Sequence, residues 1–142
     1  MRTLVALLLI TFTFGAKFLG EKNDGAPITF TILEENTAKI TNYKATPTSI
    51  IPGESVQFKM QFQGTTDVTI SKLFLDTLSD GVSLFTDSVI IGKTYSEGDK
   101  DVTGYSATIP SFCPPGSWDI LLYLKDDSDN NAAVLKCHFD IK

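Results

Sequence analysis

Histidine and cysteine, which supply many catalytic bases, nucleophiles and metal ligands, are scarce in this chain. Its 142 residues include one histidine and two cysteines. No Ser-His-Asp arrangement can be assembled around His138, whose nearest charged neighbours in the sequence are Lys136 and Asp140, and we expect this side chain to be exposed. Glycine-rich phosphate loops and spacings typical of metal ligands are also missing. The sequence therefore gives no support for an enzyme, a cofactor or a metal centre.

The most acidic stretch, residues 126–131, has two interpretations. Clustered carboxylate and amide oxygens suit calcium, but the stretch lacks the glycine and the distal glutamate of an EF-hand loop. The same residues are strong turn formers and are too charged to bury. We interpret the stretch as a solvated hairpin loop.

Positive charge is limited relative to negative charge. The chain has 12 Lys and Arg residues against 17 Asp and Glu residues, for a net charge of −5. Nucleic acid phosphates require a basic surface, so we expect no nucleic acid partner.

The apolar run at the N-terminus is too short to span a membrane. It follows Arg2 and covers residues 3–14, whereas a membrane-spanning helix needs roughly 20 apolar residues. A charged start and a short apolar run are typical of a secretory signal, with cleavage after Gly15 or Ala16, and an uncleaved anchor is the alternative. The sequence predicts a signal peptide at residues 1–16, one domain at residues 17–142, and a secreted or lumenal protein.

Alternation with a period of two residues dominates the rest of the chain, and no segment has helical spacing over three turns. Each short alternating segment ends at residues typical of turns, which favours an all-β, immunoglobulin-like two-sheet antiparallel sandwich. The expected strands cover residues 28–33, 39–45, 56–62, 68–75, 83–91, 102–109, 117–125 and 133–142.

Several blocks of the sequence resemble the ML lipid-recognition family, which includes the Niemann-Pick type C cholesterol carrier and phosphatidylglycerol/phosphatidylinositol transfer proteins. The clearest block is C-terminal. A Pro-Pro-Gly turn at 114–116 precedes Trp118, an alternating strand, an Asp- and Asn-rich turn, and a Leu-x-Cys-x-Phe-x-Ile strand at 135–141. Upstream, residues 40–47 and 51–58 are similar to the family's second strand, its proline, its Pro-Gly turn and the strand beyond.

The resemblance implies a sandwich whose sheets separate at one edge to hold the apolar body of a sterol or phospholipid. It implies no covalent step and transient contact with membranes. We expect a monomer. The segments 92–101 and 111–115 would flank the entrance. Large, adaptable side chains at inner positions would form the walls. These are Phe58, Met60, Phe62, Phe74, Leu84, Phe85, Tyr105, Phe112, Trp118 and Ile120.

The cysteines depart from the family pattern. Members usually carry six, and the cysteine of the last strand bonds to one near the first strand. Cys137 fits the last-strand position, but residues 34–36 contain no partner. In the expected hairpin Cys137 faces Ile120, and Cys113 precedes Ile120 by seven residues. Seven residues of extended strand span about 23 Å, whereas the Cα atoms of a disulfide lie within about 7 Å of each other. Either a bend at the prolines brings the two thiols together, or Cys137 is a small buried residue.

A second reading of the same pattern needs no cavity. The inner faces of a sandwich normally interlock as a core, and the alternating apolar residues are sufficient for one. The chain would then be a solid-cored adhesion or interaction module that acts through its loops. An internal apolar space of several hundred Å³ would favour the lipid carrier over this module.

Overall fold

The structure is a computed structural model that describes residues 25–142, so the predicted signal peptide and residues 17–24 lie outside it. The strands, in chain order, are β1 (Ala26–Pro27), β2 (Thr29–Glu35), β3 (Ala38–Thr46), β4 (Ser49–Ile50), β5 (Ser55–Gly64), β6 (Val68–Ser79), β7 (Val82–Tyr95), β8 (Lys100–Thr108), β9 (Gly116–Asp126) and β10 (Asn131–Ile141). No helix of the described part has the length and apolar character needed to cross a membrane.

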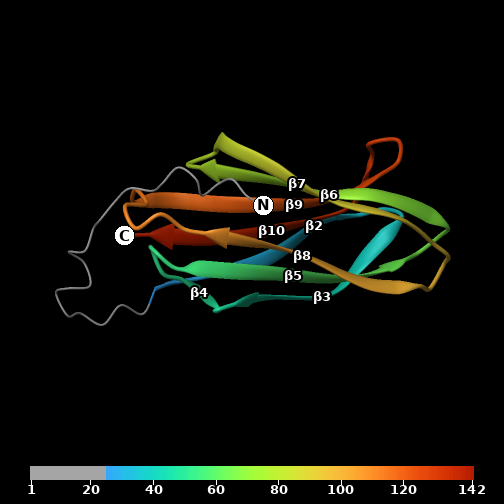
Figure 1. The fold of residues 1–142 in the computed structure, drawn as a ribbon, viewed down its shortest axis with the longest axis horizontal. Coiled ribbons are helices and arrows are strands. Elements are labelled where there is room, and N and C mark those ends of the chain that lie inside the picture. Colours follow the sequence, from blue (N-terminus) through green and yellow to red (C-terminus); the bar gives the residue numbers. More distant parts are fainter. Residues whose placement is uncertain (1–24) are drawn as a thin grey trace.

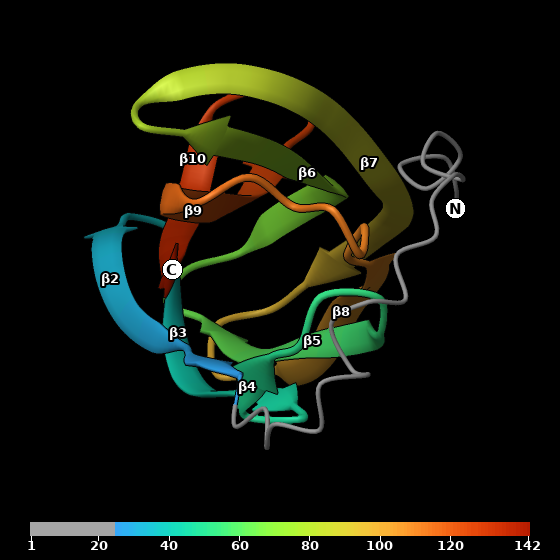
Figure 2. The same ribbon diagram turned by 90° about the vertical axis from the view of Figure 1, so that its left-hand side faces the viewer.

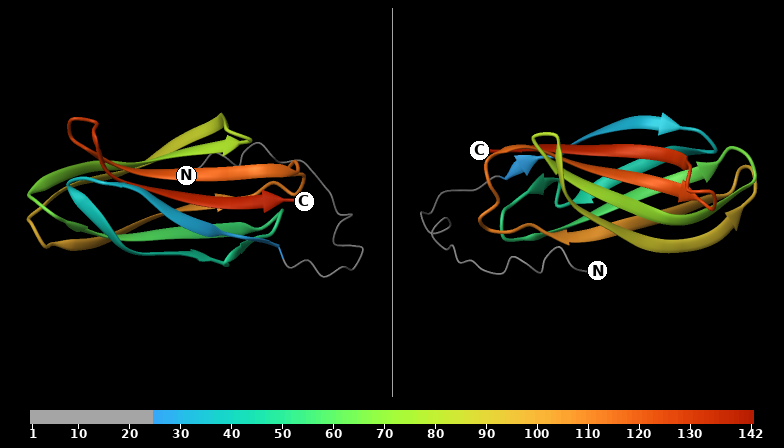
Figure 3. Two further views of the ribbon diagram at one scale, coloured as in Figure 1. Left: turned by 180° about the vertical axis from the view of Figure 1, so that it is seen from behind. Right: turned by 90° about the horizontal axis from the view of Figure 1, so that it is seen from above.

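Two antiparallel sheets face each other. The larger has the order β2-β10-β9-β6-β7 and the smaller has the order β3-β5-β8, while β1 and β4 form a separate two-stranded ladder. The strands follow the long axis of the molecule (Figure 1), and the view along that axis shows the larger sheet opposite the smaller one (Figure 2). The same two layers are visible from behind and from above (Figure 3). The predicted all-β, immunoglobulin-like sandwich is confirmed.

The segment 92–101, predicted to be a loop beside the entrance, is mostly strand. Tyr95 still pairs with Val68 of β6, and Lys100 already pairs with Gln63 of β5. The intervening turn is only residues 96–99, and it lies at the end of the sandwich opposite residues 109–116 (Figure 1). The prediction was wrong because polar residues on the outer side of an edge strand have the composition of a loop.

The core lies between the two sheets, where the inner faces of their strands meet. On β5, the inner residues Val56, Phe58, Met60 and Phe62 are at most 2% exposed, and the polar residues between them point outward. Antiparallel strands with one face in the core and one in water alternate in this way. The strongest period-two pattern in the sequence therefore became the central strand of the smaller sheet.

The predicted C-terminal hairpin consists of β9 and β10. Cys137 pairs with Ile120 of β9 and with Phe30 of β2, and it is fully buried. Cys137 and Cys113 are both free thiols. Of the two alternatives drawn from the sequence, the structure has the one in which Cys137 packs as a small apolar side chain.

Substitution of Gly104 by alanine tests the close approach of β8 to β5. A Cβ at Gly104 would collide with the carbonyl oxygen of Phe58. Because backbone atoms of a central strand cannot move aside easily, we expect Gly104→Ala to lower the free energy of unfolding by about 1–3 kcal/mol. Ser106→Ala, at an exposed position of the same strand, is the control and should change stability by no more than about 0.5 kcal/mol. Equal urea midpoints for the two variants would contradict this account.

Candidate functional site

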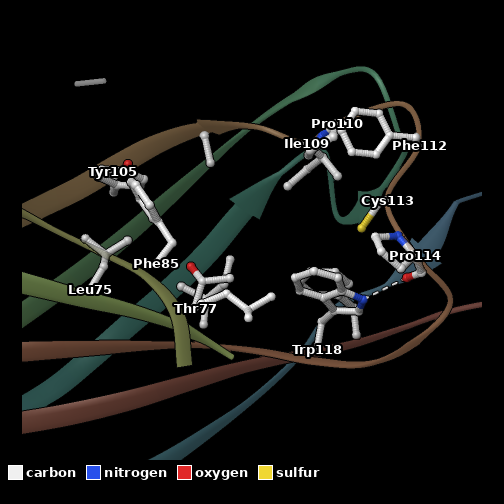
Figure 4. Close-up of a pocket in the computed structure, with 14 residues that line it drawn as sticks. Leu75, Thr77, Phe85, Tyr105, Ile109, Pro110, Phe112, Cys113, Pro114 and Trp118 are labelled. Carbon is white, nitrogen blue, oxygen red and sulfur yellow. Dashed lines mark hydrogen bonds between the residues drawn. The ribbon is translucent and has the colours of Figure 1, made fainter. Parts of the chain in front are cut away.

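An apolar cavity of about 350 Å³ lies between the sheets at one end of the sandwich. One side is formed by β6, β7, β9 and β10 of the larger sheet, and the other by β8 and the segment that follows it (Figure 4). The lining residues are Leu75, Thr77, Leu84, Phe85, Tyr105, Ala107, Ile109, Pro110, Phe112, Cys113, Pro114, Trp118, Ile120 and Phe139.

The cavity lies where β8 ends at Thr108 and the chain continues as the loop 109–115, which we call the mouth loop. Ile109, directly after β8, donates its N–H to Glu54 O (3.1 Å) and accepts a hydrogen bond from Gly53 N–H (2.7 Å). Pro110 and Pro114 then prevent the chain from extending the ladder, because proline has no N–H to donate. The inner side chains of the β6–β7 hairpin consequently face the end of β8 and the mouth loop, and space remains between them.

The cavity reaches from the core to the surface. Ile120 and Phe139, at its deep end, are 3% and 2% exposed, whereas Leu84 and Phe112, at its mouth, are 59% and 53% exposed. Trp118 stands between these two pairs. Its indole lies parallel to the ring of Phe139, with centroids 6.3 Å apart, and its Nε1–H donates to the carbonyl oxygen of Pro114 (3.0 Å). That hydrogen bond fastens the mouth loop to β9 (Figure 4).

Hydrogen bonds between the sheets close the long edge beside the cavity. Tyr105 of β8 donates its hydroxyl to Asp87 of β7 (2.8 Å), and Tyr95 of β7 donates to Asp101 of β8 (2.6 Å). The hydrogen bond from Tyr95 holds the pKa of Asp101 below its usual value. Burial raises the pKa of Tyr95, and the hydrogen bond to the Asp101 carboxylate raises it further. Because its hydroxyl is bonded to Asp87, Tyr105 can present its ring to the cavity without leaving a buried polar atom unpaired.

Six of the ten residues predicted as cavity walls lie together in the lining. They are Leu84, Phe85, Tyr105, Phe112, Trp118 and Ile120. The segment 111–115, predicted to flank the entrance, supplies three lining residues, Phe112, Cys113 and Pro114.

The other four predicted wall residues lie elsewhere, so the prediction is corrected for them. Phe58, Met60 and Phe62 belong to the filled core, where the ring of Phe62 meets that of Tyr95 edge-on at 5.3 Å. Phe74 lies on the opposite face of β6 from buried Leu73 and Leu75, and its ring packs on Tyr123 with centroids 5.8 Å apart. The alternation of β6 could have identified Phe74 as outward-facing.

Several lining residues were not among those predicted as cavity walls from the sequence. These are Leu75, Thr77, Ala107, Ile109, Pro110, Cys113, Pro114 and Phe139. Ala107 and Ile109 follow Tyr105 at intervals of two, so the β8 alternation contained a signal for them. Thr77 is polar and Ala107 is small, and neither has the bulk that was used to choose wall residues.

His138 differs from the exposed histidine that we expected. Its side chain is only 31% exposed and lies between Asp119 of the facing strand (Nδ1 to Oδ1, 2.8 Å) and Asp140 (Nε2 to Oδ1, 3.2 Å). The hydrogen bond to Asp119, more than any other contact, raises the pKa of His138. The prediction was wrong because it considered only Lys136 and Asp140 as neighbours, although the expected hairpin, with Cys137 facing Ile120, also places Asp119 opposite His138.

The acidic stretch 126–131 forms the β9–β10 turn. One carboxylate oxygen of Asp126 accepts the backbone N–H groups of Ser128 (2.9 Å) and Asn130 (2.8 Å), so this carboxylate holds the turn itself. Among residues 25–142, no group of three or more His, Cys, Asp or Glu side chains is placed to hold a metal ion.

Comparisons with known proteins identify relatives by fold only. No protein-family model matches the chain, and no curated protein sequence matches it significantly. Among solved structures, a Niemann-Pick type C2 protein from the Japanese carpenter ant is similar with a TM-score of 0.64 and 14% identity, over 80% of this chain and 99% of that one. The C-terminal domain of wzt matches with a TM-score of 0.56 and 16% identity, over 79% and 75% of the two chains. The sporulation control protein Spo0M of Bacillus subtilis matches with a TM-score of 0.51 and 14% identity, over 84% and 49%. Identities this low establish a shared sandwich fold and nothing finer.

The reactivity of Cys113 should report on the cavity. Burial raises the pKa of this thiol to about 11, so little reactive thiolate is present near neutral pH. We expect iodoacetamide to label Cys113 slowly near pH 7 and progressively faster as the pH rises toward the pKa of the thiol. The fully buried Cys137 should stay unlabelled in the native protein. Mass spectrometry of labelled peptides measures both rates, and Cys113→Ser should remove the label. Preferential labelling of Cys137 would contradict the structure.

The stability contribution of the pair His138–Asp119 should depend on pH. Because the pKa of His138 is raised in the folded state, its contribution is complete below the unfolded pKa, near 6.5, and is lost as the pH rises through the folded pKa. We expect His138→Gln to cost more stability near pH 5 than near pH 8, by less than about 1 kcal/mol because solvent screens the pair. Urea unfolding at both pH values measures the difference. In an Asp119→Asn background, the cost of His138→Gln should differ much less between the two pH values. If the full difference remained, a group other than Asp119 would be its cause.

Proposed function

We propose that this chain is a lipid-binding and lipid-transfer protein that holds its ligand without covalent chemistry between the two sheets. The observation that carries the proposal is the apolar cavity of about 350 Å³, which is continuous from the core to the surface. Protein interiors are normally packed to the density of organic crystals, so a space this large needs an explanation. A site for an apolar ligand supplies one.

The chemistry of the lining supports an apolar ligand. Aliphatic and aromatic side chains form most of it, and the polar atoms of Trp118 and Tyr105 are bonded to Pro114 and Asp87. Burial of a few hundred Å² of ligand surface, at roughly 25 cal/mol per Å², contributes several kcal/mol before the costs of ordering. That gain is enough to extract a poorly soluble molecule, and it requires no specific hydrogen bond.

The volume supports one apolar body. It is a little more than twice the ~150 Å³ of an engineered cavity that binds benzene, and it lies near the lower end of the range for ligand pockets, roughly 300–1,000 Å³. The ring system of a sterol, or one chain of a phospholipid, suits this space better than two chains side by side. A polar group would remain at the mouth, beside Leu84 and Phe112.

The surface around the mouth supports transient contact with a membrane. Val82 of the β6–β7 hairpin is 60% exposed, and Leu84 and Phe112 are exposed beside it in the cavity rim. Exposed apolar groups at the mouth of an apolar cavity give a lipid a path that avoids water. The proposal places the mature protein, as a monomer, in the secretory lumen, in endosomes or lysosomes, or outside the cell, with no cofactor.

The alternative of a solid-cored interaction module fits the structure less well. It requires the inner faces to fill the interior along the whole sandwich, as they do around Phe58 and Phe62. At the end bounded by β7 and the mouth loop they do not. The open cavity therefore favours the carrier over the module.

Native mass spectrometry distinguishes the two functions. The protein is purified from a eukaryotic secretory host, and any co-purified molecule is extracted and identified. A one-to-one adduct with a sterol or phospholipid is the expected result. An apo mass that stays unchanged after incubation with mixed-lipid vesicles would overturn the proposal.

Filling the cavity should abolish binding. Ala107 lines the cavity from β8, and we expect Ala107→Phe to reduce lipid occupancy at least about tenfold, because the added ring takes the volume of the ligand. Phe74→Leu, on the outer face of the larger sheet, is the matched control and should leave occupancy unchanged. Thermal unfolding identifies any variant that fails to fold. Leu84→Ser then provides a second test, since this exposed rim residue can lose apolar contact with the lipid without loss of core packing.

A further inference from the structure

The smaller sheet has a charge opposite to that of the chain as a whole. Its strands β3, β5 and β8 contain a single acidic residue, Asp101, whose carboxylate is bonded to Tyr95 and Lys93 of β7 at the sheet edge. The same strands carry four lysines, which we call the lysine face: Lys39, Lys44, Lys59 and Lys100. The other eight basic residues of the chain share the remaining sequence with the other 16 carboxylates.

The four lysines gather on the outer side of the sheet. Lys44 and Lys59 are direct cross-strand partners, and Lys39 and Lys100 flank Gln63 in one row across the three strands. All four are exposed, and none forms an ion pair with another residue of the described chain. Like charges placed side by side on neighbouring strands repel one another, so an anionic partner would stabilise them.

A shallow hollow of about 240 Å³ lies within the lysine face. Lys44 and Lys59 border it, and the amide side chains of Asn42 and Gln61, also cross-strand partners, lie beside them. Ammonium and amide groups are both hydrogen-bond donors suited to phosphate or carboxylate oxygens. Val102, 53% exposed, adds an apolar contact at the same place.

The composition of the lysine face suits a lipid surface better than a protein. Protein interfaces concentrate Trp, Tyr and Arg at their centres, whereas these three strands contain no arginine or tryptophan. Apart from Tyr43 and Val102, their outer residues are lysines, amides and small side chains. The bordering Tyr43 packs its ring against Phe30 at the edge next to β2, with centroids 4.7 Å apart. Lysine is a hydrated point charge without fixed geometry, and mobile lipid headgroups can adjust to it.

We infer that the lysine face is a docking surface for an anionic lipid bilayer. The inference deepens the proposed function by naming the membrane, and its position in the fold is consistent with that function. Lys59 lies four residues from Ser55, or about 13 Å along β5, and Ser55 pairs with Thr108, where the mouth loop begins. A bilayer bound at the lysine face therefore lies close to the cavity mouth without covering it.

Binding to vesicles tests the inference, because a chain of net charge −5 has no general attraction to anionic lipid. We expect the wild-type protein to bind phosphatidylcholine vesicles containing ~30% phosphatidylserine, to ignore pure phosphatidylcholine vesicles, and to dissociate at ~1 M salt. Lys44→Gln with Lys59→Gln should weaken binding by about 25-fold, since each lysine near an anionic surface contributes roughly fivefold.

Lys72→Gln with Lys142→Gln is the matched control. It changes the net charge equally but lies outside the smaller sheet, and its vesicle affinity should stay within about twofold of wild type. Wild-type protein that does not distinguish anionic from neutral vesicles would overturn the inference and direct the search toward an acidic protein partner. Equal loss in both double variants would overturn it as well. Native mass spectrometry tests membrane docking and lipid binding in the cavity separately. A protein that carries no lipid but still binds anionic vesicles would overturn the proposed lipid carrier and support the docking surface.

Discussion

The end of β8 at Thr108 is the constraint on which the cavity depends. After Thr108 the backbone of Ile109 is held by Gly53 and Glu54, and the prolines that follow cannot extend the ladder. The β6–β7 hairpin of the larger sheet continues to its turn at Asp80 regardless. Beyond Thr108 the inner face of this hairpin is covered by the mouth loop and not by further residues of β8. A loop covers the excess apolar face, and a loop packs less closely than a strand.

The closed edge beside the cavity is held by polar bonds in place of further apolar packing. Tyr95 and Tyr105 each carry a hydroxyl across the gap between β7 and β8 to a carboxylate on the other sheet. A tyrosine supplies apolar area to the interior and one hydrogen bond at the rim, so the edge can close without drawing the two sheets into full contact. The separation between the sheets that the cavity needs is compatible with a stable edge for this reason.

The sequence predicted the sandwich well and the site only in part. The difference arises because strand alternation involves neighbouring residues, whereas the cavity involves residues that are distant in sequence. Alternation is local, so the faces of β5 and of the C-terminal hairpin were predicted correctly. The cavity depends on where two sheets end relative to each other, and no local pattern records that. Phe58 and Phe85 are both large residues chosen for their bulk, yet only Phe85 lines the cavity, whereas Phe58 packs in the filled core.

The carboxylates of this acidic chain are largely used as structural acceptors. Asp126 holds the β9–β10 turn, Asp87 accepts from Tyr105, and Asp101 accepts from Tyr95. The pKa of Asp101 lies below its ordinary 3.8, so its contribution to stability is present above that value and is lost only as the pH falls through the lower folded pKa. A mildly acidic lumen, near pH 5, leaves this bond intact. The closed edge, and the cavity beside it, are thus compatible with the acidic compartments in which a lumenal carrier would work.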